Sequence, residues 1–296
     1  MTSTQFTDQL WFRLATPLPA LVFGVLVMRR NDVPFAIWGQ NLIAGLFFMI
    51  VCVSLLRLPP LSSKRLQWGV ALTVILSVGL LLATFADARL NGVHRWVVVG
   101  SLRIHAGAVC LPALILTLGE ILNHPEWKLA GWFAALPGVG VAGLLLLQPD
   151  AAQASAFAGA LIVLLVSCRQ TLRVSWVAAL LIAVCAVWSW MRPDPLLPVP
   201  HVEGIVGLAA QNGRLWLLAS LASLALLPCP FLLDWGRVGR TSPTSLALGL
   251  YFALNVIAPC LGSFPVPLLG FGLSPIAGYF VALTWLLSPK PGAKLS

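Results

Sequence analysis

The stretch FAIWGQNLIAGLFFMIVCVSLL, residues 35–56, contains no charged side chain. An apolar run of 18 residues or more is long enough to cross the hydrocarbon layer of a bilayer as a helix. Such runs recur along the whole chain, which is 59% hydrophobic and only 9% charged, against about 25% charged residues in an ordinary soluble domain. The sequence therefore indicates an all-α, polytopic integral membrane protein, since helices satisfy their backbone hydrogen bonds without water.

The apolar runs predict about ten membrane-spanning helices. We place them near 10–28, 35–56, 67–86, 105–122, 129–147, 154–168, 174–191, 212–233, 244–263 and 266–287. No connecting segment is long enough to separate soluble domains, so residues 1–296 are expected to form a single transmembrane domain. Residues 1–10 contain no Lys or Arg and no small-residue cleavage site follows, so we expect the first span to be retained.

The distribution of Lys and Arg predicts the orientation. With a cytoplasmic N-terminus, eleven of the 18 basic residues fall in cytoplasmic segments and seven in outer segments. Cytoplasmic loops carry the excess of positive charge, so we predict an N-in, C-in topology. The basic residues are scattered singly over short loops, so the net charge of +9 indicates contact with membrane lipids and not with nucleic acid.

Two patterns in the sequence imitate functional sites. The six cysteines lie within or beside apolar runs and lack metal-ligand spacing, which favours a packing role. Residues 138–143, GVGVAG, match a dinucleotide-binding GxGxxG motif. That motif needs a strand before it and a helix after it, whereas these glycines lie inside a spanning run, where small residues permit close helix packing.

Acidic residues are scarce, nine in 296, and two stand at membrane boundaries. Asp150 ends the sequence Gln148-Pro149-Asp150, and Glu203 follows His201 by two positions. A charge beside the hydrocarbon layer is costly, so such a residue is a candidate for function. For Asp150 an alternative remains open, because an acid at this place also caps the N-terminus of the following helix.

Four stretches, in order, resemble segments of the SEDS family (shape, elongation, division and sporulation), which includes FtsW, RodA and SpoVE. They are GVHRW at 92–96, LQPD at 147–150, PHVEGI at 200–205 and, after Asn255, FPVPLLGFGLS at 264–274. The family forms ten-helix glycosyltransferases of the bacterial cytoplasmic membrane. The resemblance implies polymerisation of lipid II at the outer face of that membrane, in cell elongation, division or shape control.

The resemblance also implies a set of site residues. Glu203 aligns with the essential Asp of the family and is the catalytic candidate, as a general base for the attacking sugar hydroxyl. The expected substrate-binding residues are Arg95, Gln148, Asp150, His201 and Gln211. The implied partners are lipid II and a class B penicillin-binding protein, a transpeptidase. No metal site or cofactor is expected, although the reaction leaves room for a divalent cation.

The chain departs from the family at several of its positions. The family motif P-S-E-x-x-K aligns with 106–111, where Ala108 and Leu111 replace the acid and the base. The outer loop before Glu203 is cut to about 192–200, and His105 stands where the family has Gln, in a role we expect to be polar packing. Two alternatives therefore stay open: a catalytically inactive scaffold or regulator of cell-wall synthesis, and a transporter of lipid-linked precursors.

Overall fold

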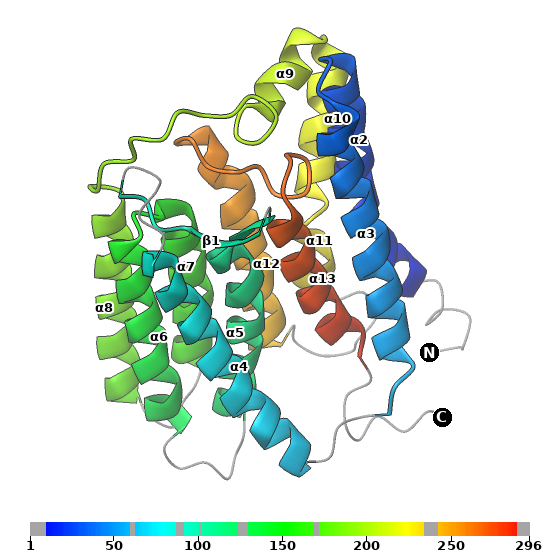
Figure 1. Ribbon diagram of the computed structural model, residues 1–296. Coiled ribbons are helices and arrows are strands. Elements are labelled where there is room, and N and C mark those ends of the chain that lie inside the picture. The colour runs from blue at the N-terminus through cyan, green and yellow to red at the C-terminus, as the bar shows by residue number, and fades with distance from the viewer. Residues whose placement is uncertain are drawn as a thin grey trace.

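The computed structural model describes residues 10–59, 63–86, 92–100, 102–123, 130–167, 172–233 and 242–288 (Figure 1). Its helices are α2 (Leu18–Arg30), α3 (Phe35–Leu56), α4 (Ser63–Ala83), η1 (Thr84–Ala86), α5 (Ala106–Asn123), α6 (Ala130–Leu147), α7 (Ala151–Ser167), α8 (Leu172–Ser189), α9 (Ile205–Gln211), α10 (Arg214–Ala225), α11 (Cys229–Leu232), α12 (Pro243–Ile257), η2 (Ala258–Cys260) and α13 (Leu273–Leu287). Two strands, β1 (Trp96–Val99) and β2 (Leu102–His105), complete the described elements.

Within the described ranges, seven helical segments are long and apolar enough to cross a membrane. They are Leu10–Arg30, Phe35–Leu56, Arg65–Ala86, Ala106–Asn123, Ala130–Leu147, Arg214–Leu232 and Pro243–Cys260. Three shorter apolar helices, Ala151–Ser167, Arg173–Ser189 and Leu273–Leu287, account for the other predicted spans. The prediction of an all-α polytopic membrane protein is confirmed.

Two of the predicted spans differ from the helices in the structure. The last helix, α13, begins at Leu273 and not at 266, because Leu268 has φ +60°, outside the right-handed helical region. The predicted run 212–233 is interrupted at 226–228, where Pro228 separates α10 from α11. Both departures from the predicted spans therefore lie where the backbone leaves the helical conformation.

A β-hairpin precedes α5, and the sequence reading missed it. Strands β1 and β2 pair antiparallel, with Trp96 opposite His105 and Val99 opposite Leu102. Gly100 makes the turn with φ +62°, a conformation that costs glycine little. The hairpin defines one end of the helix bundle, which we call the hairpin end.

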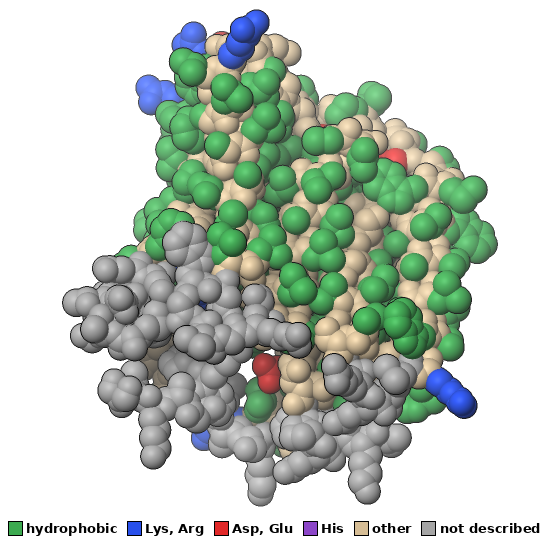
Figure 2. All heavy atoms as spheres, turned by 180° about the vertical axis from the view of Figure 1, so that it is seen from behind, with side chains coloured by type: hydrophobic (Ala, Val, Ile, Leu, Met, Phe, Trp, Pro, Cys, Tyr) green, Lys and Arg blue, Asp and Glu red, His purple; other side chains and the backbone are tan. Residues whose placement is uncertain are grey.

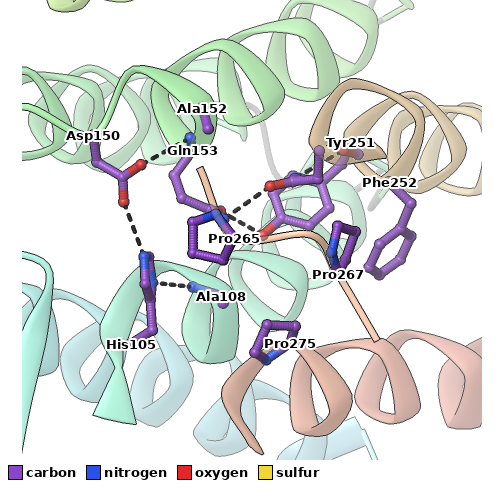
Figure 3. A pocket seen from close by; sticks show the side chains of 11 residues that line it. His105, Ala108, Asp150, Ala152, Gln153, Tyr251, Phe252, Pro265, Pro267 and Pro275 are labelled. Carbon is purple, nitrogen blue, oxygen red and sulfur yellow. Dashed lines mark hydrogen bonds and ion pairs between the residues drawn. The ribbon is translucent and has the colours of Figure 1, made fainter. Parts of the chain in front are cut away.

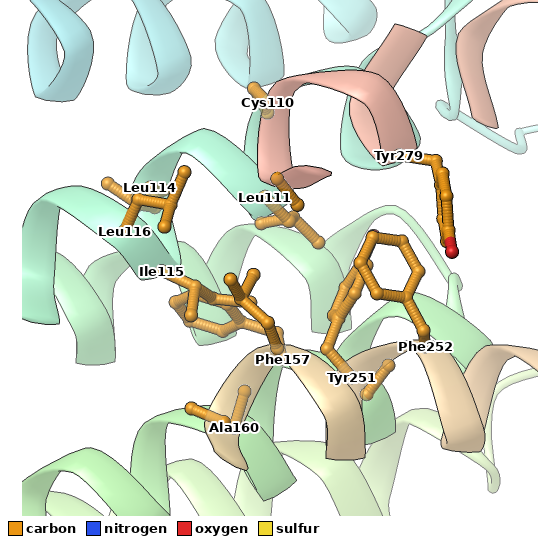
Figure 4. Packing of buried hydrophobic residues seen from close by; sticks show 14 of the residues in the cluster. Cys110, Leu111, Leu114, Ile115, Leu116, Phe157, Ala160, Tyr251, Phe252 and Tyr279 are labelled. Carbon is orange, nitrogen blue, oxygen red and sulfur yellow. The ribbon is translucent and has the colours of Figure 1, made fainter. Parts of the chain in front are cut away.

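Helix α5 occupies the centre of the bundle. In its most apolar 18 residues, 78% are buried inside the protein, against 17% in the corresponding stretch of Arg65–Ala86 at the edge of the bundle. It packs against α4, α6, α7, α12 and α13, while α7 also packs against α8 and α12. Figure 4 shows Leu111, Leu114 and Ile115 of α5 among Phe157 and Tyr251 of the neighbouring helices. The core is therefore apolar along the length of α5.

Two glycines leave room for a close neighbour, a backbone in one case and a leucine side chain in the other. A Cβ atom at Gly278 of α13 would lie 2.0 Å from the carbonyl oxygen of Ala108 in α5. A Cβ atom at Gly138 of α6 would lie 2.3 Å from Leu161 of α7. Gly138 opens the GVGVAG segment, so this segment is helical and serves helix packing at its first glycine, as predicted.

The outer surface of the bundle is mainly apolar. In Figure 2 hydrophobic side chains cover the helix faces, and the coloured Lys and Arg side chains lie near the two ends. Fully or largely exposed side chains include Ile43 of α3, Ile75 of α4 and Leu180 of α8, at 68%, 66% and 66% exposure. Such a surface is stable against lipid and unstable in water.

Candidate functional site

The four family-like stretches, which lie far apart in the sequence, meet at the hairpin end. Arg95 in the first stretch donates through Nη2 to the carbonyl oxygen of Pro149 in the second. The backbone N–H of His105, at the end of the hairpin, donates to Ser274 Oγ at 2.9 Å. Ser274 closes the fourth stretch, so the hairpin connects three of the four.

The third stretch joins this cluster through backbone contacts with the fourth. The N–H of Phe271 donates to the carbonyl oxygen of His201 at 2.9 Å, and that of Val266 donates to Val202 at 3.3 Å. A Cβ atom at position 270 would lie 2.4 Å from the same Val202 oxygen, so only glycine fits there. The loop carrying Glu203 is thereby fixed against the loop before α13.

Arg95 is a buried cation at this end. It is 2% exposed, and its Nη2 also donates to Asp194 Oδ2 at 2.6 Å. Its guanidinium carbon lies 5.4 Å from the ring centre of Phe264. Its Nε has no hydrogen-bond partner among the described residues. Asp194 is the more accessible partner, with a side chain 22% exposed.

Behind Arg95, His105 faces Asp150 (Figure 3). His105 Nε2 lies 3.4 Å from Asp150 Oδ2, while Asp150 Oδ1 accepts the N–H of Gln153 at 3.2 Å, which caps α7. His105 Nδ1 accepts the N–H of Ala108 at 3.3 Å, so the neutral ring carries its proton on Nε2, toward Asp150. Burial lowers the pKa of His105, Asp150 raises it, and Arg95 lowers it further.

Next to this pair, three polar side chains bridge α7 and α12. Gln153 Nε2 donates to Asn255 Oδ1 at 2.9 Å, and Tyr251 Oη donates to Gln153 Oε1 at 2.7 Å. These side chains, with His105 and Asp150, line a cavity of about 30 Å³ (Figure 3). That volume holds about one water molecule or one hydroxyl group, so no sugar ring enters the cavity as it stands.

Glu203 is not among the residues that line this cavity. Its Oε2 accepts the N–H of Val199 at 2.7 Å, inside the turn 199–204. Burial raises the pKa of Glu203; the bond from Val199 and the charge of Arg95 oppose the rise, and Asp194 adds to it. Burial also lowers the pKa of His201, which lies half-buried near the ring of Phe271.

The two glutamines named from the sequence lie elsewhere. Gln148 is 1% exposed, and its Nε2 donates to the carbonyl oxygen of Leu81 at 3.0 Å and to Thr84 Oγ1 at 2.9 Å. It therefore joins the end of α6 to the end of α4. Gln211 ends α9 with an exposed side chain, and none of the recorded contacts joins it to the four stretches.

Sequence reasoning named Asp150 but missed Gln153 and Tyr251. Gln153 is the one amide side chain in the largely apolar helix α7, and Tyr251 is one of two tyrosines in the chain. A polar side chain inside a spanning helix is a signal that could have found both. Among the described residues, no group of three or more His, Cys, Asp or Glu side chains is arranged to hold a metal ion.

The sequence profile of the FtsW/RodA/SpoVE proteins, described as cell cycle protein, matches residues 11–195, more than half of the chain. The chain belongs to this family. The predicted membership in the SEDS family is thereby confirmed. No curated protein sequence matches the chain at a significant level.

Solved structures of the family share the fold. An aspartate-to-alanine variant of the rod shape-determining protein RodA from Thermus thermophilus superimposes with a TM-score of 0.67 at 19% identity, covering 93% of this chain and 96% of that one. RodA from the same organism gives 0.57 at 20% identity, with the same coverage. A peptidoglycan synthase complex that coordinates polymerization and crosslinking gives 0.62 at 21% identity, covering 93% and 97%.

Proposed function

We propose that this SEDS protein is a peptidoglycan glycosyltransferase that polymerises lipid II at the outer face of the bacterial cytoplasmic membrane. The observation that carries the proposal is the meeting of the four family-like stretches at the hairpin end. That cluster combines a carboxylate of raised pKa, Glu203, with a buried cation, Arg95. Glycosyl transfer from a lipid pyrophosphate uses this pair of groups: a base for the hydroxyl and positive charge for the leaving group.

In the proposed topology residues 1–296 form one transmembrane domain whose ten apolar helices all cross the membrane. The termini lie in the cytoplasm and the hairpin end lies outside. A 15-residue helix such as α13 is about 22 Å long, shorter than a hydrocarbon layer of about 30 Å. Its neighbours on both sides are protein, so the irregular segment 261–272 completes the span without exposing backbone to lipid.

In the proposed reaction, a sugar hydroxyl of one lipid-linked disaccharide attacks the anomeric carbon of another. The C–O bond to the pyrophosphate breaks as the new glycosidic bond forms, and the hydroxyl proton passes to the carboxylate of Glu203. A raised pKa makes Glu203 a stronger base than an ordinary glutamate, as long as it is ionised. Arg95 would stabilise the charge on the departing lipid pyrophosphate.

Asp150 and His201 complete the proposed substrate-binding surface. Asp150 Oδ2 faces His105 Nε2 at 3.4 Å, so in the proposed complex a sugar hydroxyl takes the place of the imidazole ring beside this oxygen. His201 lies on the same loop as Glu203. Substrate contact by Gln148 and Gln211 stays a prediction, as does a supporting divalent cation.

A catalytically inactive scaffold on the same fold is the second candidate. Two observations favour it: Arg95 already holds Asp194, and the cavity beside His105 is only about 30 Å³. Ala108, at the position of the family acid, lines that cavity without a polar side chain. A transporter would need a polar path between the two faces, whereas the described polar cluster gives way to the apolar residues of α5, such as Leu114.

The proposed partner is a class B penicillin-binding protein. Support comes from the structural likeness to the peptidoglycan synthase complex. The exposed apolar faces of α3 and α4 leave room for a membrane helix of such a partner.

Labelled lipid II incubated with the purified full chain, alone and with a candidate transpeptidase, tests the proposal. Glu203→Gln keeps the size and an acceptor for Val199 but removes the base, so strand synthesis should fall by about 10²–10⁴-fold. Asp32→Asn removes an exposed carboxylate between α2 and α3 and should change little. The acid limb of the rate profile of the unaltered chain should lie above the ordinary glutamate pKa of 4.5.

The outcomes separate the candidates. Full strand synthesis by Glu203→Gln would remove Glu203 as the base. Absence of strands under both conditions, with lipid II or the transpeptidase still bound, would establish the scaffold in place of the enzyme.

A further inference from the structure

The only recorded side-chain partner of Arg95 in the described part of the chain, apart from the ring of Phe264, is Asp194. Arg95 is 2% exposed and Asp194 is 22% exposed, so Asp194 is the member of the pair that faces solvent. An anion that approaches Arg95 from the hairpin end therefore meets Asp194 first. The Arg95 Nε, also buried and without a partner among the described residues, remains as an unused donor.

The segment around Asp194 holds the carboxylate in place. Pro193 and Pro195 flank it and restrict its backbone. Asp194 Oδ1 accepts the N–H of Leu196 at 3.2 Å, which leaves Oδ2 for Arg95 at 2.6 Å. A guanidinium group binds carboxylate and phosphate oxygens in the same geometry, so this carboxylate occupies Arg95 as a phosphate oxygen would.

The charges near Arg95 strengthen this competition. Asp194 is hydrogen-bonded to Arg95, and Glu203 lies within electrostatic range of both residues. Two carboxylates, those of Asp194 and Glu203, therefore act on one guanidinium group. A pyrophosphate entering this environment is repelled until one of these negative charges moves away or is removed.

We propose that Asp194 is an internal competitor for an anion site at Arg95, and that pyrophosphate groups bind there by displacing it. The lipid pyrophosphate of the donor substrate is the ligand class, and only this choice of ligand rests on the proposed function. The apparent affinity for pyrophosphate is reduced by the fraction of molecules in which Asp194 holds Arg95. Asp194 therefore sets how strongly the site binds its anion.

Binding of undecaprenyl pyrophosphate to the detergent-solubilised full chain tests this inference, with undecaprenol as the uncharged control and inorganic pyrophosphate as the lipid-free arm. Asp194→Asn should bind undecaprenyl pyrophosphate about 10-fold more tightly than the unaltered chain, which is about 1.4 kcal/mol. Asp32→Asn, which removes an exposed carboxylate away from Arg95, should change it less than twofold. Undecaprenol binding should be the same in all three proteins.

If Asp194→Asn binds both undecaprenyl pyrophosphate and inorganic pyrophosphate more tightly, the site recognises the phosphate group alone. If only undecaprenyl pyrophosphate binds more tightly, the site recognises the lipid-linked form. Unchanged or weaker binding of both by Asp194→Asn would overturn the inference, because Asp194 would then only position Arg95. These binding results do not depend on whether the chain makes glycan strands. A failure of the proposed function can therefore be distinguished from a failure of this inference.

A second measurement uses the unaltered chain and does not depend on the folding of a variant. If pyrophosphate displaces Asp194, the segment 194–199 loses its side-chain bond to Arg95, and the amides of this segment should exchange with deuterium several-fold faster when the ligand is added. Slower or unchanged exchange of the segment 194–199 in saturating undecaprenyl pyrophosphate would contradict displacement.

Discussion

Replacing Gly278 by alanine places a methyl group where α13 and α5 are closest. The new Cβ atom would lie 2.0 Å from the carbonyl oxygen of Ala108 and 3.2 Å from a ring carbon of Pro112. Ordinary contact begins at 3.4 Å, so the oxygen is about 1.4 Å too close. A carbonyl oxygen within a helix cannot rotate away, so the two helices must separate.

The separation costs packing and one hydrogen bond. Overpacking a close-packed interior costs about 1–3 kcal/mol, and a gap of even 0.5–1 Å removes a quarter to a half of the dispersion energy between facing atoms. The bond from His105 N–H to Ser274 Oγ crosses the same interface and contributes about 0.6–1.7 kcal/mol in a membrane protein. Alanine regains about 0.5–1 kcal/mol as the better helix former, so we expect a net loss of about 2–3 kcal/mol.

Reversible unfolding in mixed micelles measures this change. Gly140→Ala is the matched control, because Gly140 also lies inside a membrane helix but has no atom within 4 Å of the added Cβ. It should be neutral or more stable by up to about 1 kcal/mol. Equal stability of Gly278→Ala and Gly140→Ala would refute the close approach of α13 to α5 and the reasoning built on it.

Two further changes test the polar cluster. Because burial lowers the pKa of His105, the folded chain keeps the ring neutral while the unfolded chain takes up a proton below about pH 6.5; stability is fully present above that pH and falls as the pH drops toward the lowered value. Melting temperatures between pH 5 and 8 should show this slope, and His105→Gln should flatten it; an unchanged slope would mean that another group is responsible. Removing the bond between Tyr251 and Gln153 by Tyr251→Phe and Gln153→Leu, singly and together, should give a coupling energy of about 0.6–1.7 kcal/mol, and additive effects of the two changes would argue against the bond.

The positions of the helices followed from the sequence because apolar length alone decides which segments cross a membrane. Each predicted run overlaps an apolar helical segment of the structure, with α10 and α11 sharing the run 212–233. The boundaries moved where backbone conformation overrides hydropathy, as at Pro228 between α10 and α11 and at Leu268, with φ +60°, before α13. The hairpin was missed because residues 96–104 lie between the predicted spans 67–86 and 105–122, where only the β-branched run at 97–99 before the Gly100 turn indicates a strand.

The candidate site was predicted only in part, because hydropathy does not determine which boundary residues meet. Arg95, Asp150 and Glu203 were named from the sequence, and the structure gathers them at one end of the bundle. The partner of Arg95 was not foreseen, because Asp194 lies 99 positions away and only the fold brings the two together. The contact of His105 with Asp150 likewise depends on how α5 packs against α7.

The hairpin joins the two site residues Arg95 and His105 in one small structural unit. Arg95 directly precedes β1, His105 ends β2, and the bond from Ala106 N–H to the Arg95 carbonyl oxygen closes the base at 3.0 Å. The tip carries Val99 and Leu102, which are 58% and 48% exposed, so lipid or a bound protein can contact the hairpin there. Any displacement of the hairpin as a unit would change the contacts of Arg95 with Asp194 and of His105 with Asp150 together.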